Sequence, residues 1–323
     1  MTTNEKFTGK RRPHRFISKA TQDFLKEARG VKKFSMFDFI HGYTYSRWSH
    51  FYVSLAISAK KYHLKFAFDI LVSIYSIFLK LLPKNRGIKG ISFEDSYHGK
   101  AIPIDSAKKL VSIKESIHIG DLEKVIPYKS ARDIILKNPD HILALQCPCR
   151  SAREHPCLPM DVCLIIGEPF ASFIMEHKPD RARWITSIEA VDILEAEEER
   201  GHVHHAFFKD AMLGRFYAIC NCCECCCGAI QAHKRGTPML ASSGYIAVVD
   251  DEACVACGQC LSYCQFNALS MTNDGLQIDT EKCMGCGVCV SHCPQGALSL
   301  KLSPQKGLPL DITKLIKDKT FPE

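Results

Sequence analysis

The sequence predicts an α+β protein, built from a helical N-terminal region, a cysteine-rich mixed α/β domain and a small repetitive C-terminal domain. Three observations lead to this fold class. Residues 1–100 are basic and rich in aromatic side chains, residues 101–240 alternate between helix-like and strand-like hydrophobic patterns, and residues 241–302 contain an internal repeat. Residues 303–323 then form a tail. A chain of 323 residues is long enough for two or three domains that each bury a core.

Cysteine is the outlier of the composition, with 18 residues in the chain. Secreted disulfide scaffolds are usually short and begin with a signal peptide, whereas residues 1–16 contain no apolar segment and no small-residue cleavage site. We therefore expect a cytoplasmic, reducing location. There, clustered thiols serve metal binding or redox chemistry more often than disulfide formation.

Charge is distributed unevenly along the chain. Residues 1–100 hold 19 Lys and Arg against 7 Asp and Glu, whereas residues 101–323 hold 23 against 28. No apolar run within residues 47–82 reaches the roughly 20 residues that a membrane-spanning helix needs. We favour a pair of helices packed on the protein's own core. The alternative is that residues 1–82 dock on a redox partner protein or peripherally on a membrane surface.

The middle of the chain begins with a predicted helix and a predicted strand. Ser130 is a suitable N-cap for a short amphipathic helix over residues 130–138, which ends before Pro139. Residues 141–147 are apolar and predict a buried strand that delivers Cys147 at its end.

A second helix is predicted over residues 187–200. Thr186 and Glu189 form a capping box at its start, and Gly201 suits its end. Ile188, Val191 and Leu194 are expected on one face of this helix. The following strand, residues 202–208, carries His202, His204 and His205, which are more often core or surface residues than ligands.

Residues 249–271 and 278–300 repeat each other, and each copy contains the pattern C-x2-C-x2-C-x3-C. In this pattern three cysteines wrap one iron–sulfur cube and the fourth ligates the other cube. The predicted ligand sets are Cys254, Cys257, Cys260 and Cys293 for the first cluster, and Cys264, Cys283, Cys286 and Cys289 for the second. Gly258, Gly285 and Gly287 are expected to let the loops turn tightly.

Over residues 245–302 these motifs resemble the bacterial-type two-cluster ferredoxin domain. The resemblance implies two [4Fe–4S] clusters that relay single electrons. Cys293 is followed by the family's proline, Pro294, whereas Cys264 is followed by Gln265. Because proline is not a ligand, this departure concerns the rigidity of the loop and the reduction potential of the cluster, and not cluster binding. Zinc ribbons use different cysteine spacings.

Ten cysteines lie outside the repeat: Cys147, Cys149, Cys157, Cys163, Cys220, Cys222, Cys223, Cys225, Cys226 and Cys227. The first four would suffice for one closed site, and the pair in CPCR would point to one face if that segment were extended. In the second group, Cys220, Cys223 and Cys226 or Cys227 have the spacing of one face of a helical turn. Adjacent thiols there cannot all reach one cube, so some must be structural or serve another site.

The order of CPCR, the later cysteines and CNCCECCC resembles, over residues 120–300, a family of poorly characterised bacterial and archaeal 4Fe–4S proteins. The resemblance implies iron–sulfur redox chemistry without a defined reaction. We expect one or two additional [4Fe–4S] clusters at this candidate site. Zinc, a redox-active dithiol and unmetallated thiols are the less favoured alternatives. Arg150 and Arg153 flank CPCR and either donate hydrogen bonds to a cluster or are surface charges.

Three functions remain open from the sequence. The favoured one is an electron-transfer protein or redox-complex subunit, with redox proteins as partners. The second is an iron–sulfur oxidoreductase whose substrate meets an atypical cluster near residues 147–163 and 220–227. The third is a cluster-based redox sensor. No catalytic residue is predicted, and nucleic acid is not expected as a partner because the helix over residues 187–200 is acidic.

Overall fold

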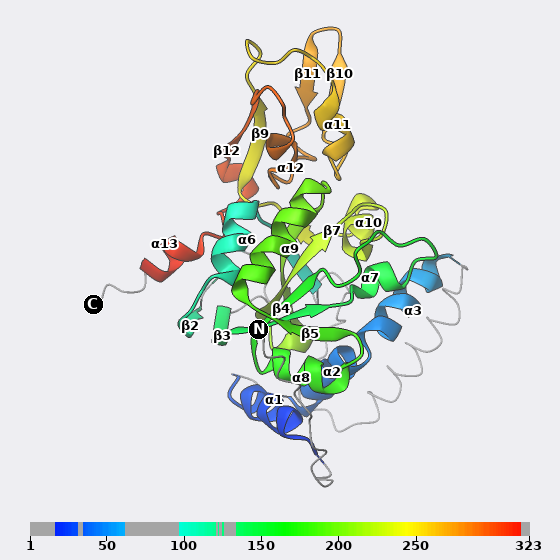
Figure 1. The fold of residues 1–323 in the computed structure, drawn as a ribbon, viewed down its shortest axis with the longest axis vertical. Coiled ribbons are helices and arrows are strands. Elements are labelled where there is room, and N and C mark those ends of the chain that lie inside the picture. Colours follow the sequence, from blue (N-terminus) through cyan, green and yellow to red (C-terminus); the bar gives the residue numbers. More distant parts are fainter. Residues whose placement is uncertain are drawn as a thin grey trace, which may run out of the picture.

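The computed structural model describes residues 17–31, 35–61, 97–120, 122, 125 and 134–317. Within them, helices cover both faces of one large sheet, and a smaller domain follows at one end of that sheet (Figure 1). The architecture is α+β with a ferredoxin-like C-terminal domain.

The large sheet has eight strands in the order β2-β3-β4-β7-β6-β1-β8, with β5 added on β3. Its pairings are antiparallel except for the parallel pair of β1 and β8. The strands are β1 Tyr97–Ala101, β2 Ile117–Ile119, β3 Ile134–Leu145, β4 Cys163–Glu168, β5 Ala182–Ile185, β6 Val203–Lys209, β7 Arg215–Cys222 and β8 Leu240–Ala241. We call this sheet with its covering helices the cysteine-rich domain.

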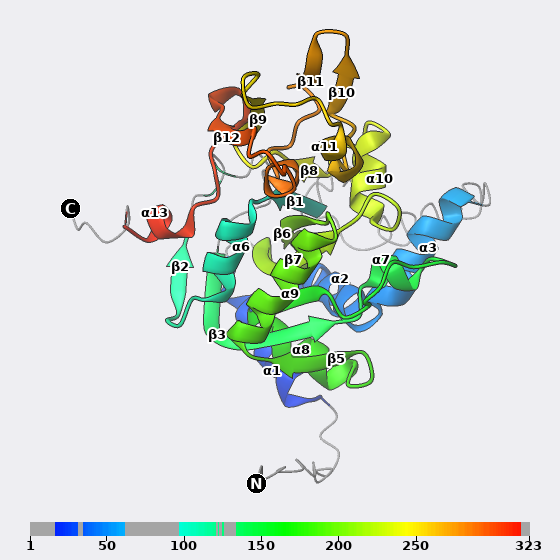
Figure 2. The same cartoon turned by 45° about the horizontal axis from the view of Figure 1, so that its top comes forward.

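Helices lie on both sides of the sheet (Figure 2). Two separate clusters of buried apolar side chains fill the spaces between the sheet and these helices. On one face lie α6 Ile104–Val111 and α9 Ser187–Glu199, joined by α13 Ile312–Lys317. The other face is covered by α1 Lys19–Arg29, α2 Met36–Arg47, α3 Ser49–Lys61, α7 Pro148–Ser151, α8 Phe170–His177, the short helix η2 Asp210–Met212 and α10 Gly228–Lys234. Burial on both faces explains why β6 is buried at every position.

The predicted helix over residues 130–138 is wrong for its described part. Residues 134–138 instead begin β3, which continues past Pro139 to Leu145. The strand pairs with β2 over residues 134–136, and its register with β4 shifts between Lys137 and Ile142. This irregularity accommodates the proline, which cannot donate a ladder hydrogen bond. Non-local pairing has overridden the local helical signal.

The helix predicted over residues 187–200 is present as α9. The Thr186 hydroxyl accepts a hydrogen bond from the Glu189 amide, and Gly201 follows the helix with a positive φ of 78°. The expected apolar face is wrong in one respect, since Ile188 is 74% exposed. The sheet-facing side instead includes Leu194 and the carboxylates of Glu197 and Glu198.

The N-terminal helices are a layer of the cysteine-rich domain. The ring of Phe24 in α1 packs edge-on against the rings of Phe39 in α2 and of Phe170 and Phe173 in α8, at centroid distances of 5.3 to 5.7 Å. Of the pair of helices predicted for residues 47–82, the described residues contain α3, whose Tyr52 packs against the same core cluster. Residues 62–82 of that prediction lie outside the described residues. No described helix has the length and hydropathy to span a bilayer.

The ferredoxin-like domain holds two small antiparallel sheets, β9 with β12 and β10 with β11. Its elements are β9 Tyr245–Val249, α11 Gln259–Tyr263, β10 Leu269–Thr272, β11 Gly275–Ile278, α12 Val288–Ser291, β12 Leu298–Leu302 and the short helix η3 Pro304–Lys306. As predicted, Gly258, Gly285 and Gly287 have positive φ, between 60° and 92°. At Gly285 a Cβ would lie 2.1 Å from the Tyr245 carbonyl oxygen, so this loop has no room for a side chain.

We predict that Gly42→Ala loosens α2 from the sheet. A Cβ at this position would lie 2.2 Å from the carbonyl oxygen of Ala211, which is backbone and has little room to move. Relief of such a clash costs about 1–3 kcal/mol of stability. Urea unfolding should show this loss, whereas Ile40→Ala, at an exposed position of the same helix, should change stability little. Equal stability of both variants would contradict the close contact.

Candidate metal centres

The two ligand sets predicted in the repeat each surround a separate cavity of about 20 Å³. Cys254, Cys257, Cys260 and Cys293 line one cavity, and Cys264, Cys283, Cys286 and Cys289 line the other. In each set the repeat motif supplies three cysteines and the other copy supplies the fourth. The remaining lining is apolar, with Leu276 and Leu298 in the first cavity and Phe266 and Met284 in the second. A hollow bounded by four thiols and apolar side chains fits a [4Fe–4S] cube.

Backbone amides point at sulfur in both halves of this domain. The amide of Ala268 lies 3.2 Å from the Sγ atom of Cys264, and the amide of Ala297 lies 3.3 Å from that of Cys293. The two contacts occupy equivalent positions of the repeat. Such amide-to-sulfur hydrogen bonds stabilise thiolate ligands and raise the potential of a cluster.

Eight of the other ten cysteines line one hollow of the cysteine-rich domain. Six of them form a connected series, after which we call the hollow the six-thiol cavity: Cys147, Cys149, Cys163, Cys220, Cys222 and Cys227. Cys223 and Cys226 also lie on its wall. Cys163 and Cys220 face each other across β4 and β7, and Cys222 lies two residues further along β7. Cys147 and Cys227 precede the first turns of α7 and α10. The thiols of Cys220, Cys163, Cys147, Cys149, Cys227 and Cys222 interact in that order, as a continuous series.

The six-thiol cavity has a volume of about 60 Å³, against about 20 Å³ for each cavity of the ferredoxin-like domain. Its far wall comes from the N-terminal helices, where Tyr45, Ser46, Ser49 and Val53 line it. The Tyr45 hydroxyl lies 3.2 Å from that of Tyr217 on β7. Burial raises the pKa of Tyr45, so its hydroxyl stays protonated.

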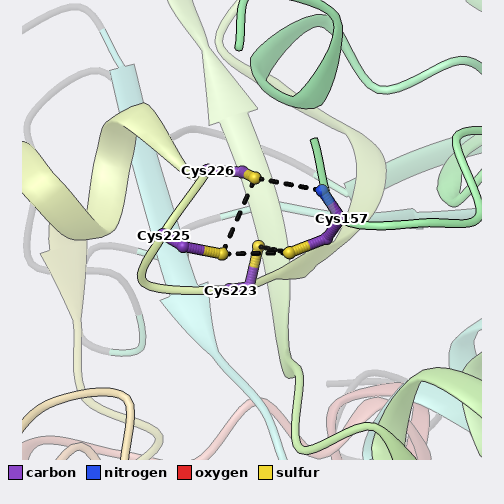
Figure 3. Close-up of side chains that lie close together, drawn as sticks. All are labelled: Cys157, Cys223, Cys225 and Cys226. Carbon is purple, nitrogen blue, oxygen red and sulfur yellow. Dashed lines mark hydrogen bonds between the residues drawn. The ribbon is translucent and has the colours of Figure 1, made fainter. Parts of the chain in front are cut away.

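The other four cysteines form a compact group, which we call the four-thiol site (Figure 3). Cys223, Cys225 and Cys226 come from the turn between β7 and α10, and Cys157 comes from the loop after α7. Their Sγ atoms all lie within 4.8 Å of one another. The sulfur of Cys157 is 3.0 Å from that of Cys225 and 3.6 Å from that of Cys223.

The structure divides the ten cysteines differently from their order in the sequence. The sequence groups Cys157 with Cys147, Cys149 and Cys163, but its thiol lies with those of the turn after β7. Residues 220–222 are strand and residues 223–227 lie in the turn before α10, so the helical turn predicted for Cys220, Cys223 and Cys226 or Cys227 is wrong. All four cysteines nevertheless line the same cavity. CPCR is also not extended, since it enters α7, yet Cys147 and Cys149 still face the same cavity.

Arg150 lies beneath the six-thiol cavity in a buried ion pair. Its Nη2 atom is 2.5 Å from Oε2 of Glu197, and both side chains are 1% exposed. The same nitrogen lies 3.1 Å from Nδ1 of His202 and 3.3 Å from the Asn221 carbonyl oxygen. Burial raises the pKa of Glu197, but the His202 hydrogen bond and the Arg150 charge outweigh it and lower the pKa overall. Arg150 is therefore no surface charge.

His202, which precedes β6, and His204 and His205 in β6 do not line the six-thiol cavity. His202 pairs with Glu197, with 2.7 Å between Nδ1 and Oε2. Nδ1 of His204 lies 2.6 Å from Oδ1 of Asn221. His205 packs beside the Phe266 ring, and burial lowers its pKa to about 3, which keeps it neutral. They are core residues, the favoured prediction.

Gln265, the residue that departs from the ferredoxin pattern, joins the two domains. Its Oε1 atom accepts a hydrogen bond of 2.7 Å from the Glu224 amide, inside CNCCECCC. Its Nε2 atom donates one of 2.9 Å to the Gly201 carbonyl oxygen at the end of α9. The Ser291 hydroxyl adds a bond of 2.6 Å to Glu198. Sequence reasoning had connected Gln265 only with loop rigidity and potential.

Two four-cysteine cavities in a pseudo-symmetric domain define an iron–sulfur protein. The comparison with protein families supports this, since residues 247–300 match the family model of the 4Fe-4S dicluster domain. This segment binds [4Fe–4S] clusters and indicates iron–sulfur electron transfer. A comparison with curated proteins finds no match. The cysteine-rich domain has no counterpart in the family match, which begins after it.

We predict that Arg150→Met destabilises the protein by about 3–5 kcal/mol, because it leaves the Glu197 carboxylate buried without its cation. Arg183→Met is the matched control: its ion pairs with Asp161 and Glu189 are exposed, and the loss of each should cost under about 1 kcal/mol. Urea unfolding of both variants measures the difference.

The ion pair also predicts a pH dependence. Because Glu197 has a lowered pKa in the folded protein, its contribution to stability is present above the ordinary value of 4.5. That contribution is lost as the pH falls through the lowered pKa. Lowering the pH should therefore reduce the stability of the unmodified protein by more than it reduces that of the Glu197→Gln variant. Identical acid unfolding curves for the two proteins would contradict the assignment.

Proposed function

We propose that this protein is an electron-transfer protein or redox-complex subunit that conducts single electrons between a redox partner and the cysteine-rich domain. The eight repeat cysteines, in the two sets that line the separate cavities, are the proposed ligands of two [4Fe–4S] clusters. A third cluster is proposed for the six-thiol cavity. A bound [4Fe–4S] cluster accepts and releases one electron without a proton or a substrate, which is the chemistry required of a relay.

The observation that carries this proposal is the order in which the cysteine cavities follow one another from surface to interior. The first set includes the exposed Cys257, beside Val255, which is 63% exposed. The second cavity is lined by Phe266 and Met284, which belong to the same apolar cluster as Cys147 and Cys163. Access for a partner is therefore at the first set, and the second set faces the cysteine-rich domain.

Gln265 supplies a hydrogen-bonded connection between the second set and the cysteine-rich domain. It directly follows the ligand Cys264, and its side chain accepts from the Glu224 amide between Cys223 and Cys225. A hydrogen-bonded route of this kind fixes the separation of the two domains. It is the role we assign to the departure from proline at this position.

The proposal predicts the iron content. Anaerobically purified protein should contain about 12 iron and 12 acid-labile sulfide per chain, from three [4Fe–4S] clusters. The double variant Cys147→Ser, Cys149→Ser should lose about four irons, while the EPR signal of the reduced ferredoxin-like domain persists. About eight irons in the unmodified protein would contradict a cluster in the six-thiol cavity.

The proposal also predicts slower electron transfer in Gln265→Ala. The variant loses both hydrogen bonds that the Gln265 side chain makes to the cysteine-rich domain, so the second set and the six-thiol cavity are held less closely. Gln277→Ala, an exposed glutamine on β11, is the control. Rapid-freeze EPR after mixing with a reduced viologen dye should show the third signal appearing later in the first variant alone, at unchanged iron content. Equal rates would contradict the proposed route.

A second candidate function is an iron–sulfur oxidoreductase that binds its substrate in the six-thiol cavity. The volume of about 60 Å³ favours it, since each cavity assigned to a cube measures about 20 Å³. The protonated hydroxyls of Tyr45 and Tyr217 would serve as hydrogen-bond donors there. Cyanide should then alter the EPR signal of the third cluster and leave the other two unchanged, whereas a closed relay would show no change.

The proposed setting is the cytoplasm, with a redox protein as partner at the exposed end of the ferredoxin-like domain. Docking through the N-terminal region is part of the same proposal. In its described part, Trp48, Phe51 and Leu55 are exposed on and beside α3. These side chains suit a partner protein or a peripheral contact with a membrane surface.

A further inference from the structure

We propose that the four-thiol site of Cys157, Cys223, Cys225 and Cys226 binds a single tetrahedral zinc ion, not an iron–sulfur cube. Cys157 and Cys225 lie outside the six-thiol cavity, and the site shares only Cys223 and Cys226 with the wall of that cavity. The inference does not rest on the electron-transfer function. It follows from the separation of the sulfur atoms, from the way the backbone is held around them, and from the chemistry of four thiolates.

The sulfur separations match one ion. Four thiolates at about 2.3 Å from a tetrahedral zinc ion stand about 3.8 Å from one another. The Sγ atom of Cys157 is 3.0 Å from that of Cys225 and 3.6 Å from that of Cys223. The Sγ atoms of Cys225 and Cys226 are 3.7 Å apart, and all four lie within 4.8 Å of one another. Thiolates of a cube are each bound to a different iron, so they stand further apart and enclose the inorganic sulfides.

The position of the thiols also favours one ion over a cube. The four side chains converge on a common point from one turn and one loop (Figure 3). Cys225 and Cys226 are neighbours in the sequence, so their thiols cannot both reach separate irons of one cube that Cys157 and Cys223 also bind. They can nevertheless occupy two corners of a small tetrahedron, because the turn between β7 and α10 rotates successive side chains toward Cys157.

The side chains of Arg153 and Gln231 hold this turn in place through hydrogen bonds to its carbonyl oxygens. Arg153 donates to the Cys226 carbonyl oxygen through Nε at 3.1 Å and through Nη2 at 2.9 Å. Gln231 donates from Nε2 to the carbonyl oxygens of Glu224 and Cys225, at 3.1 and 2.9 Å. Its Oε1 atom accepts from Arg153 at 2.8 Å. These bonds leave the four thiols free to point at the ion and fix their directions.

Charge and exposure are those of a structural zinc site. Four thiolates on a divalent ion carry a net charge of −2, which the nearby Arg153 guanidinium partly compensates. The Cys157 amide lies 3.4 Å from Sγ of Cys226 and stabilises negative charge on that sulfur. Cys225 is exposed, so the ion has a path from solvent. A closed set of four protein ligands leaves no position for a substrate.

The zinc ion would join the loop after α7 to the turn after β7. Cys157 and Cys223 are 66 residues apart in the chain. Cys223 directly follows the last strand residue of β7, and Cys227 of the six-thiol cavity directly follows Cys226. Binding one ion here therefore positions the thiols on both sides of the turn.

Metal analysis of the full-length protein tests the proposal. Protein purified anaerobically, with zinc and iron in the growth medium, should contain about one zinc per chain in addition to its iron. X-ray absorption at the zinc edge should show four sulfur neighbours at about 2.3 Å and no iron scatterer nearby. Absence of zinc, or zinc with nitrogen or oxygen neighbours, would overturn the proposal, and neither result depends on the iron count.

Variants locate the ion. Cys225→Ser should lose the zinc and keep its iron, since Cys225 is exposed and outside the six-thiol cavity. Cys149→Ser is the matched control, because it changes that cavity and should keep the zinc. Loss of about four irons from Cys225→Ser, with no change in zinc, would show a cube at this site and overturn the inference. If Cys225→Ser fails to fold, the absorption spectrum of the unmodified protein still decides.

Discussion

The antiparallel pairing of β4 with β7 is the constraint on which the metal centres depend. It places Cys163 opposite Cys220, and so brings the segment after β3 to the segment that ends β7. Both segments then leave the sheet at the same end of the strands, one into α7 and the other into α10. The backbone hydrogen bonds of this ladder fix its register, so Cys163 and Cys220 are held opposite each other.

Polar and charged groups are buried close to the cysteines of these strands. Arg150 enters the interior beside the cysteines, and Glu197 of α9 and Asn221 of β7 supply its partners. Without Glu197 the guanidinium would be a buried unpaired charge, which is costly. The N-terminal helices close the opposite side with Tyr45 and Ser46. The basic, aromatic-rich N-terminal region therefore contributes, in its described part, to the wall of the cavity.

The two halves of the protein use cysteine in different ways. In the ferredoxin-like domain each set of four surrounds a small hollow, and the repeat alone supplies all the ligands. In the cysteine-rich domain the thiols come from loops, strands and helix starts that are distant in the sequence, and they separate into a compact group of four and an open group of six. Gln265 connects the halves by hydrogen bonds, where the ferredoxin pattern would have a proline that cannot form them.

By itself the sequence determined the ferredoxin-like domain, its ligand sets as predictions and the helix after Thr186, because these depend on short repeated spacings and local caps. It identified the remaining cysteines as a metal-binding group but not their partition. Only the tertiary structure decided that Cys157 lies with Cys225, and that residues 134–138 are a strand. Both outcomes depend on contacts between residues far apart in the chain, for which local spacing and propensity carry no information.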